Sequence, residues 1–183
     1  FSNKLSFTIT SMGYSNKIIY RNNAKLNDDI YVTGNLGDSY LGLEALNNKA
    51  KFKNKDKLYF VDKYYKPDLP LNLTKYLLKF ANSSIDVSDG LIDDLAKMIN
   101  KQRLSFHLFE NKIPVSSKLS NYIKKQRLNK INLISNGDDY QVLFTASINK
   151  ARIIQNASKT TGIKITKIGK IVSGKDRSLI FDQ

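Results

Sequence analysis

Apolar and polar residues alternate along several short stretches of the chain, as they do in strands with one buried face. Between these stretches, apolar residues recur every three or four positions, which is the spacing of an amphipathic helix. Strand and helix patterns follow one another along the chain, which predicts an α/β or interleaved α+β fold with a mixed sheet flanked by helices. Strands are expected at residues 5–12, 29–34, 84–88, 104–109, 140–145, 163–168 and 178–181, and helices at 40–46, 73–80, 91–99, 116–126 and 149–160.

Turn residues mark the ends of several of these elements. Asp38 or Ser39 is expected to cap the helix at 40–46, and Gly162 to end the helix at 149–160. Residues 47–70 are basic and aromatic, and two prolines close the stretch at Pro67 and Pro70. Because proline removes a backbone donor and clashes with the preceding turn, a helix cannot continue through this stretch, which we interpret as a connection.

The stretch at 84–91 carries the most informative polar residues. Its alternation puts Asp86 and Ser88 on one face of a strand, and Asp89 follows in a turn before the next helix. Hard carboxylate oxygens beside a helix N-terminus suit Mg²⁺ and phosphate together. A structural interpretation stays open, in which Asp89 is only an N-cap and Asp93 and Asp94 are surface acids that complement the helix dipole.

Three other positions offer weaker candidates. Asp138 and Asp139 follow a glycine and precede an apolar strand, so they form either an ordinary turn or a carboxylate site for a cationic substrate or a metal. The spacing Gly34-x-x-Gly37 between a strand and a helix favours a plain turn over a phosphate loop. His107 is the only histidine, and without cysteine or a second histidine we expect a structural role for it.

Composition narrows the function classes. The 183 residues hold 30 Lys and Arg against 16 Asp and Glu, a net charge of +14 with no cysteine. The lysines are spread along the whole chain, so a solvated basic surface is favoured over a nucleic-acid site, and we do not expect nucleic acid as a partner. Disulfides and thiolate sites are excluded, and the absence of cysteine is compatible with the cytoplasm. No apolar run is long enough to span a membrane.

Three motifs occur in a distinctive order. They are Asp-Asp-Ile-Tyr-Val-Thr-Gly-Asn-Leu-Gly-Asp-Ser at 28–39, Ser-Ile-Asp-Val-Ser-Asp-Gly-Leu at 84–91, and Gly-Asp-Asp-Tyr-Gln-Val-Leu-Phe-Thr at 137–145. Together they resemble the thiamine-monophosphate kinase family, in the aminoimidazole-ribonucleotide synthetase-like superfamily. The resemblance implies a cytoplasmic enzyme that transfers the γ-phosphate of ATP directly to thiamine monophosphate, with Mg²⁺ between the phosphates.

The resemblance also implies roles for single residues. Asp86 and Asp89 match metal ligands of the family, and Arg21 and Ser88 match ATP contacts. Asp138 matches a glutamate that contacts the thiamine substrate, although it is one methylene shorter. Two further departures are Asn136 in place of a glycine and Gln141 in place of a second glutamate.

The resemblance covers only the carboxy-terminal part of the family pattern. Residues 1–22 would be the last strand and linker of an amino-terminal ATP-binding domain, and 23–183 a carboxy-terminal α/β domain resembling that of aminoimidazole-ribonucleotide synthetase. We expect a chain that is inactive alone and a homodimer when the full amino-terminal domain is present. Two alternatives are a non-catalytic basic module that binds nucleic acid or another polyanion, and a related ATP-dependent synthetase of the superfamily.

Overall fold

Six strands form one mixed sheet in the computed structural model, which describes residues 5–50, 52–175 and 177–181. The strand order is β2-β4-β1-β5-β3-β6, and every neighbouring pair is antiparallel except β3 and β6. The central strand β1 is buried along its whole length. The strands are β1 (Asp29–Thr33), β2 (Ser83–Val87), β3 (Leu104–Phe109), β4 (Gln141–Ala146), β5 (Ile165–Ser173) and β6 (Leu179–Phe181).

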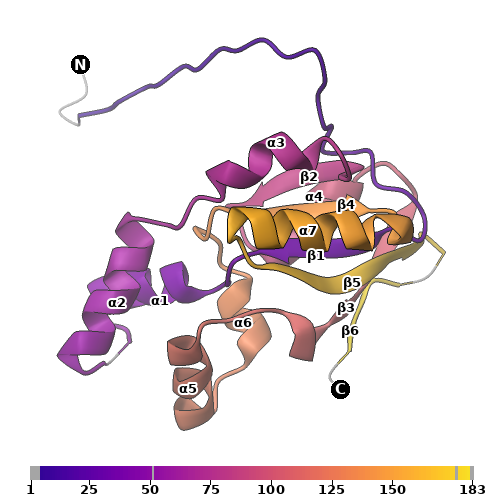
Figure 1. The fold of residues 1–183 in the computed structure, drawn as a ribbon. Coiled ribbons are helices and arrows are strands. Elements are labelled where there is room, and N and C mark those ends of the chain that lie inside the picture. The colour runs from indigo at the N-terminus through magenta and orange to yellow at the C-terminus, as the bar shows by residue number, and fades with distance from the viewer. Residues whose placement is uncertain (1–4, 51, 176, 182–183) are drawn as a thin grey trace.

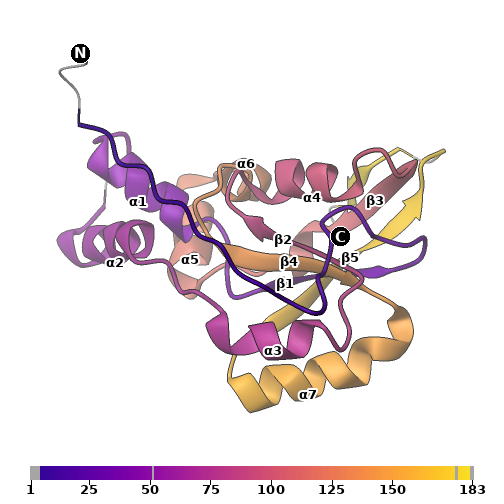
Figure 2. The same ribbon diagram turned by 90° about the horizontal axis from the view of Figure 1, so that it is seen from above.

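Helices cover both faces of the sheet (Figures 1 and 2). On one face, α4 (Leu91–Ile99) and α6 (Lys130–Ile134) bury the main apolar core against the strands, with Leu95, Met98 and Leu143 among its fully buried residues. On the other face, α3 (Thr74–Leu77) and α7 (Ala151–Thr161) pack over a second core that is centred on Phe144 of β4. Because both faces are covered, the strands are rich in apolar residues on both sides.

A third apolar cluster lies at one end of the sheet. It joins α1 (Asp38–Leu46), α2 (Asn54–Tyr65) and α5 (Ser117–Gln126) through Leu41, Phe60 and Leu119. The three 3₁₀ turns of the described chain are η1 (Leu71–Leu73), η2 (Glu110–Lys112) and η3 (Ile148–Lys150). None of the helices in the described ranges has the length and apolar character that crossing a membrane requires.

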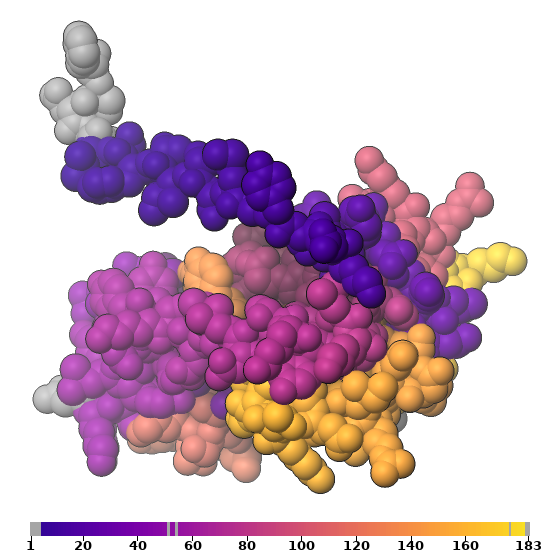
Figure 3. Space-filling view, turned by 45° about the horizontal axis from the view of Figure 1, so that its top comes forward, coloured from indigo at the N-terminus to yellow at the C-terminus, as the bar shows by residue number. Residues whose placement is uncertain are grey.

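The amino-terminal segment runs as an extended arm away from the body (Figure 3). Residues 5–18 are exposed and form neither helix nor strand. The strand predicted at 5–12 is therefore wrong for this structure, because no described strand lies beside it to supply hydrogen bonds. Residues 1–4 of the proposed first region lie outside the described residues, and the division at residue 22 stays a prediction.

Most other predicted elements agree with the structure to within a few residues, α6 was not predicted, and three further points differ. Residues 47–70 contain α2, and the two prolines lie after this helix instead of preventing it. The helix predicted at 73–80 is reduced to a 3₁₀ turn and the single turn of α3. Neither Asp38 nor Ser39 caps α1; the N-cap is Gly37, whose φ of 87° is left-handed and free of strain in glycine.

Candidate functional site

Asp94 organises the turn between β2 and α4. One of its carboxylate oxygens accepts hydrogen bonds from the backbone N–H groups of Ser88, Asp89 and Gly90, at 2.9, 2.9 and 3.1 Å. Its side chain is only 1% exposed. The predicted surface role of Asp94 is therefore wrong, and so is the alternative interpretation in which Asp89 is only an N-cap. The cap position is Gly90, and Asp94 reaches back from inside the helix to satisfy the turn.

Lys97 connects Asp94 to the predicted metal ligand Asp89. Its ammonium nitrogen lies 2.9 Å from Asp94 Oδ1 and is also paired with Asp89 Oδ2. Both partners raise the pKa of Lys97, with Asp89 the larger cause. Asp89 is 65% exposed and Asp86 is exposed as well, so both carboxylates are open to solvent.

The second motif packs directly against this turn. Backbone N–H groups of Asp138 and Tyr140 donate to the carbonyls of Ser88 and Val87, at 3.0 and 2.8 Å. β2 and β4 then pair in register, with Asp86 opposite Val142. The predicted site residues Asp86, Ser88, Asp89 and Asp138 are thus brought to one edge of the sheet.

Two glycines make this close approach possible. A Cβ on Gly137 would overlap the carbonyl of Ser88, and one on Gly90 would overlap the carbonyl of Ser135. Both glycines also have positive φ, 77° and 120°, which L side chains rarely adopt. A larger residue at either position would push the two motifs apart.

Asp138 and Tyr140 occupy strained backbone conformations at the same edge. Their φ angles are 59° and 50°, in the left-handed region that non-glycine residues seldom adopt. The Tyr140 hydroxyl lies 3.5 Å from Asp138 Oδ1. Burial raises the pKa of Tyr140, and the charges of Asp138 and Asp86 raise it further. The Asp138 carboxylate thus lies beside the Tyr140 phenol, and Asp86 acts on that phenol through its charge.

The first motif joins the other two through buried hydrogen bonds. Asp139 Oδ2 accepts from the backbone N–H of Gly37 at 2.8 Å, which satisfies a donor at the start of α1. The Thr33 hydroxyl donates to Gln141 Oε1 at 2.8 Å, and the same oxygen of Thr33 accepts from the N–H of Val142. All three motifs therefore form one connected structure.

A polar pocket of about 160 Å³ opens where the first and third motifs meet. Asp38, at its wall, accepts from Tyr59 at 2.9 Å and from Ser116 at 2.7 Å. Gln141 donates to the carbonyl of Asp68 at 2.7 Å. The pocket is lined by Gly34, Asn35, Asp38, Ser39, Tyr59, Lys63, Pro67, Asp68, Asp139 and Gln141.

Both buried carboxylates of this pocket favour the protonated form more than usual. Burial raises the pKa of Asp139 to about 7, and the nearby charge of Asp38 raises it as well. Hydrogen bonds from the backbone N–H groups of Gly37 and Ser39 act in the opposite direction and lower this pKa. Burial also raises the pKa of Asp38, whereas the hydrogen bonds from Ser116 and Tyr59 lower it. The elevated pKa of Asp139 makes the charge of this pocket sensitive to pH near neutrality.

The carboxylates at the sheet edge fit a Mg²⁺ ion that also has substrate phosphates. Within the described ranges, no three His, Cys, Asp or Glu side chains gather as a metal site. Asp86 and Asp89 supply two solvent-facing carboxylates, and Mg²⁺ is commonly held by one or two carboxylates plus substrate phosphates. The residues present fit a shared site and not a metal cage made by this chain alone.

Arg21 lies apart from the other predicted site residues. It is exposed, and the neighbouring Asn23 bonds to the carbonyl of Asn82 at the beginning of β2, whereas Asp89 follows the end of that strand. His107, predicted to be structural, packs edge-on against Phe181 with a ring separation of 5.1 Å.

Sequence reasoning missed the supporting residues of the site. The sequence pattern puts Asp94 at the surface, leaves Asp139 between an ordinary turn and a carboxylate site, and indicates no individual role for Thr33, Tyr59 or Lys63. The sequence did hold one signal for Asp94, namely its spacing of six residues from Ser88. An aspartate in the first turn of a helix can accept hydrogen bonds from backbone N–H groups of the turn that precedes the helix. The partners of Asp139 and Tyr59 come from distant segments and leave no local signal.

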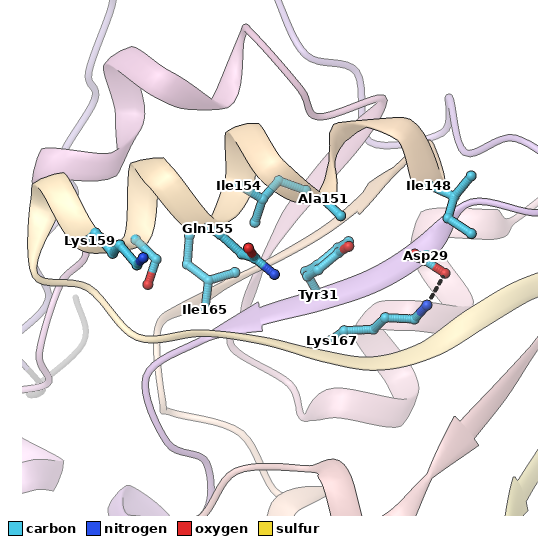
Figure 4. Close-up of a pocket in the computed structure, with 10 residues that line it drawn as sticks. Asp29, Tyr31, Ile148, Ala151, Ile154, Gln155, Lys159, Ile165 and Lys167 are labelled. Carbon is cyan, nitrogen blue, oxygen red and sulfur yellow. Dashed lines mark ion pairs between the residues drawn. The ribbon is translucent and has the colours of Figure 1, made fainter.

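A separate cavity of about 410 Å³ lies between α7 and the sheet (Figure 4). Asp29 and Lys167 form an ion pair of 2.7 Å across its wall, so its buried carboxylate already has a partner. Tyr31 adds a phenol whose pKa is raised to about 12 by burial and by Asp29. Its lining includes Ile148, Ile154 and Ile165, which makes it more apolar than the pocket at the motifs.

Comparison with known proteins finds similarity to thiamine-monophosphate kinases. No protein-family model matches the chain. The curated thiamine-monophosphate kinase of Buchnera aphidicola subsp. Schizaphis graminum is 36% identical over the whole chain, which covers 57% of that protein.

Solved structures agree with this sequence similarity. The crystal structure of thiamine monophosphate kinase from Aquifex aeolicus superposes with a TM-score of 0.78 at 27% identity, over 93% of this chain and 55% of that one. A structure of AaThiL complexed with AMPPCP and TMP superposes with a TM-score of 0.74 at 28% identity, over 88% and 50%. Sequence and fold together therefore confirm the relation of this chain to the thiamine-monophosphate kinase family, and the chain spans about half the length of the relatives it matches.

Proposed function

We propose that this chain is the carboxy-terminal part of a Mg²⁺-dependent thiamine-monophosphate kinase, which transfers a phosphoryl group from ATP to thiamine monophosphate. The observation that carries the proposal is the convergence of the three family motifs on one edge of the sheet. It is supported by the similarity to curated kinases along the whole chain and by a related structure that holds AMPPCP and TMP. The family resemblance extends the proposal to a cytoplasmic homodimer.

In this proposal each residue has a distinct task. Asp86 and Asp89 would hold Mg²⁺, and that ion would supply positive charge between the phosphates when bound. Ser88 and Arg21 would contact ATP, and Asp138 would contact the thiamine substrate. Asp94 would position Ser88 and Asp89 by holding the backbone of their turn. Catalysis would then come from positioning and charge neutralisation, without a covalent enzyme intermediate.

Lys97 would help to keep the site intact before substrates arrive. It lies between Asp89 and Asp94, so the exposed and the buried carboxylate repel one another less. When Asp89 binds a metal, Lys97 would keep its bond to the buried Asp94. The loop geometry would therefore not depend on the metal.

We further propose that the isolated chain makes no thiamine diphosphate. Two carboxylates and a serine at an open edge cannot surround a nucleotide and its metal ions, and the chain covers about half of its relatives. The residues that complete the site would belong to the part of the family pattern that this chain does not match.

The test compares the chain alone with a fusion to the complementary half of a curated relative. We expect turnover of ATP and thiamine monophosphate only in the fusion. In the fusion, Asp86→Asn should lower kcat about a hundredfold, equivalent to about 3 kcal/mol of lost transition-state stabilisation. Asp93→Asn is the matched control, since Asp93 is an exposed acid in the first turn of the same helix.

Each result has a direct reading. Turnover by the chain alone would contradict the proposed inactivity of the fragment. An active fusion that is equally affected by Asp86→Asn and Asp93→Asn would contradict the proposed site. A folded fusion that binds neither ATP nor thiamine monophosphate would contradict the proposed reaction.

A further inference from the structure

A cavity of about 520 Å³ lies beside the first turn of α5, outside the site at the three motifs. Its lining residues come from η2 and the loop after it, from the first turn of α5, from the beginning of α6 and from the start of β5. Figure 1 shows where α5, α6 and β5 lie in the fold. Three of the lining residues are lysines, namely Lys112, Lys130 and Lys164, and none of the lining residues is acidic. The charged side chains that line this cavity are therefore all positive.

The three lysines have no carboxylate partner among the described residues. The ammonium of Lys130 donates to the backbone carbonyl of Glu110 at 2.6 Å, and that of Lys164 lies 3.4 Å from Asn35 Oδ1. Lys112 lies 4.7 Å above the ring of Phe109. The ion pairs of the described chain involve other lysines, including Lys118 at the far side of α5.

Lys130 is the least ordinary of the three. It is half-buried, and burial lowers the pKa of its ammonium, with the charge of Glu110 acting in the opposite direction. A partly desolvated cation that is bonded only to a carbonyl gains more from an anion than an exposed lysine does. Solvent therefore screens the charge of Lys130 less, whereas Lys112 and Lys164 are exposed and add positive charge that has no carboxylate partner in the described ranges.

Hydroxyl groups and apolar side chains complete the lining. Ser117, Ser120 and Thr166 can donate hydrogen bonds to oxygen atoms, and Ile113, Pro114 and Val115 form an apolar part of the wall. The volume lies in the range of small-molecule sites, which are about 300–1,000 Å³. Cations, hydroxyl donors and an apolar wall in one hollow are the groups that recognise a phosphate joined to an organic part.

We propose that this cavity binds a phosphate-bearing small molecule, with Lys112, Lys130 and Lys164 as the contacts to its phosphate groups. The site is separate from the carboxylate edge, which contains none of the cavity's residues. It is linked to the polar pocket of the motifs, because Ser116 of the cavity donates to Asp38, and Lys164 contacts Asn35. Ligand binding would therefore change the contacts of Asn35 and Asp38 at the start of α1.

The test measures binding of inorganic pyrophosphate and of AMP to the full chain by calorimetry at low and physiological salt. We expect both to bind, and AMP to bind more tightly than inorganic phosphate, measured in the same series, because the apolar wall contacts the organic part of AMP. The triple variant Lys112→Gln, Lys130→Gln, Lys164→Gln should lose about tenfold or more in affinity. The charge-matched control is Lys17→Gln, Lys75→Gln, Lys175→Gln, at three exposed positions outside the cavity.

Amide chemical shifts locate the ligand in the same samples. Shifts at Ser117, Ser120 and Thr166, with affinity unchanged in the control and in Asp86→Asn, support the proposal. Equal weakening in both triple variants would show attraction to the basic surface as a whole and overturn it. Loss of binding in Asp86→Asn alone would assign the ligand to the carboxylate edge, and absence of binding to the wild-type chain would also overturn the proposal. Circular dichroism checks that each variant is folded.

Discussion

At the scale of single residues, Asp94 shows how a buried charge holds a functional turn. One carboxylate oxygen serves three backbone donors, and the other oxygen is paired with Lys97. A buried donor without an acceptor costs about 1–3 kcal/mol, so the three N–H groups together make this position sensitive. The same acid in the first turn of α4 also lies at the positive end of the helix dipole.

We therefore expect Asp94→Ala to lower the free energy of unfolding by on the order of 3 kcal/mol. The control is Asp93→Ala, which removes an exposed acid from the same turn and should cost about 1 kcal/mol or less. Urea unfolding of both variants measures the difference. Similar small losses in the two variants would show that the turn holds its shape without Asp94.

Asp139 provides a prediction about pH at the same scale. Its pKa in the folded chain is about 7, above the ordinary value of 3.8, so the folded state binds this proton more tightly than the unfolded state. The stabilising effect of the proton is complete at pH below the unfolded pKa and is lost as the pH rises from about 4 to about 7. Asp139→Asn removes this titration.

Unfolding of the wild type and of Asp139→Asn should therefore respond differently to pH. Between pH 4 and 7 the wild type should lose stability relative to the variant, and above pH 8 the difference should be constant. Thermal unfolding across this range provides the measurement. Parallel curves for the two proteins would contradict the elevated pKa of Asp139.

At the scale of elements, the amino-terminal arm is a strand pattern without a sheet. Leu5, Phe7 and Ile9 alternate with serine and threonine and are 84%, 83% and 93% exposed. An extended segment with one apolar face and unpaired backbone groups pairs readily with another chain. The body of the fold does not use this segment, because its own sheet is already covered on both faces.

We predict that the chain self-associates through residues 1–13, of which 5–13 are described here, and that the association rises with concentration. Deleting residues 1–13 should give a monomer with an unchanged melting temperature. Phe7→Ser with Ile9→Ser should weaken association in the same direction, since the apolar face is lost while the backbone remains. Analytical ultracentrifugation over a range of concentrations decides the question. An oligomer that survives the deletion would place the contact elsewhere.

At the scale of the whole molecule, the net charge of +14 is distributed and not concentrated at the motifs. The motif site carries acids, the cavity beside α5 carries lysines, and much of the remaining charge lies on exposed lysines. Opposite charges at neighbouring sites favour different ligands. The cavity beside α5 therefore suits anionic small molecules, and the acidic pocket at the motifs suits cationic groups.

A spread of surface lysines also predicts only weak binding of nucleic acid. Any binding to single-stranded or duplex DNA should fade steeply between low and physiological salt and show no sequence preference. Fluorescence anisotropy with labelled oligonucleotides at two salt concentrations tests this. Tight binding at physiological salt would instead favour the alternative of a basic nucleic-acid module.

The sequence by itself determined the mixed sheet, most of its strands, and the residues that converge at its edge. Periodicity and turn residues act locally, so the strands predicted at 29–34, 104–109 and 163–168 need no knowledge of their neighbours, and β1, β3 and β5 begin within two residues of these positions. Local rules could not find α2, because the prolines that argued against a helix lie just after it. They also assigned a strand to 5–12, because alternation records a potential to pair and not the presence of a partner.

The tertiary structure alone decided which acids are buried and what each one contacts. Asp93 and Asp94 are adjacent in sequence and look alike there, yet only Asp94 faces the turn, and the difference comes from the rotation of about 100° between neighbouring positions on a helix. Asp139 reaches Gly37 across 102 residues of sequence, and Gln141 reaches Thr33 across 108. Such contacts depend on strand order, and strand order is set by long-range pairing that no local pattern in the sequence records.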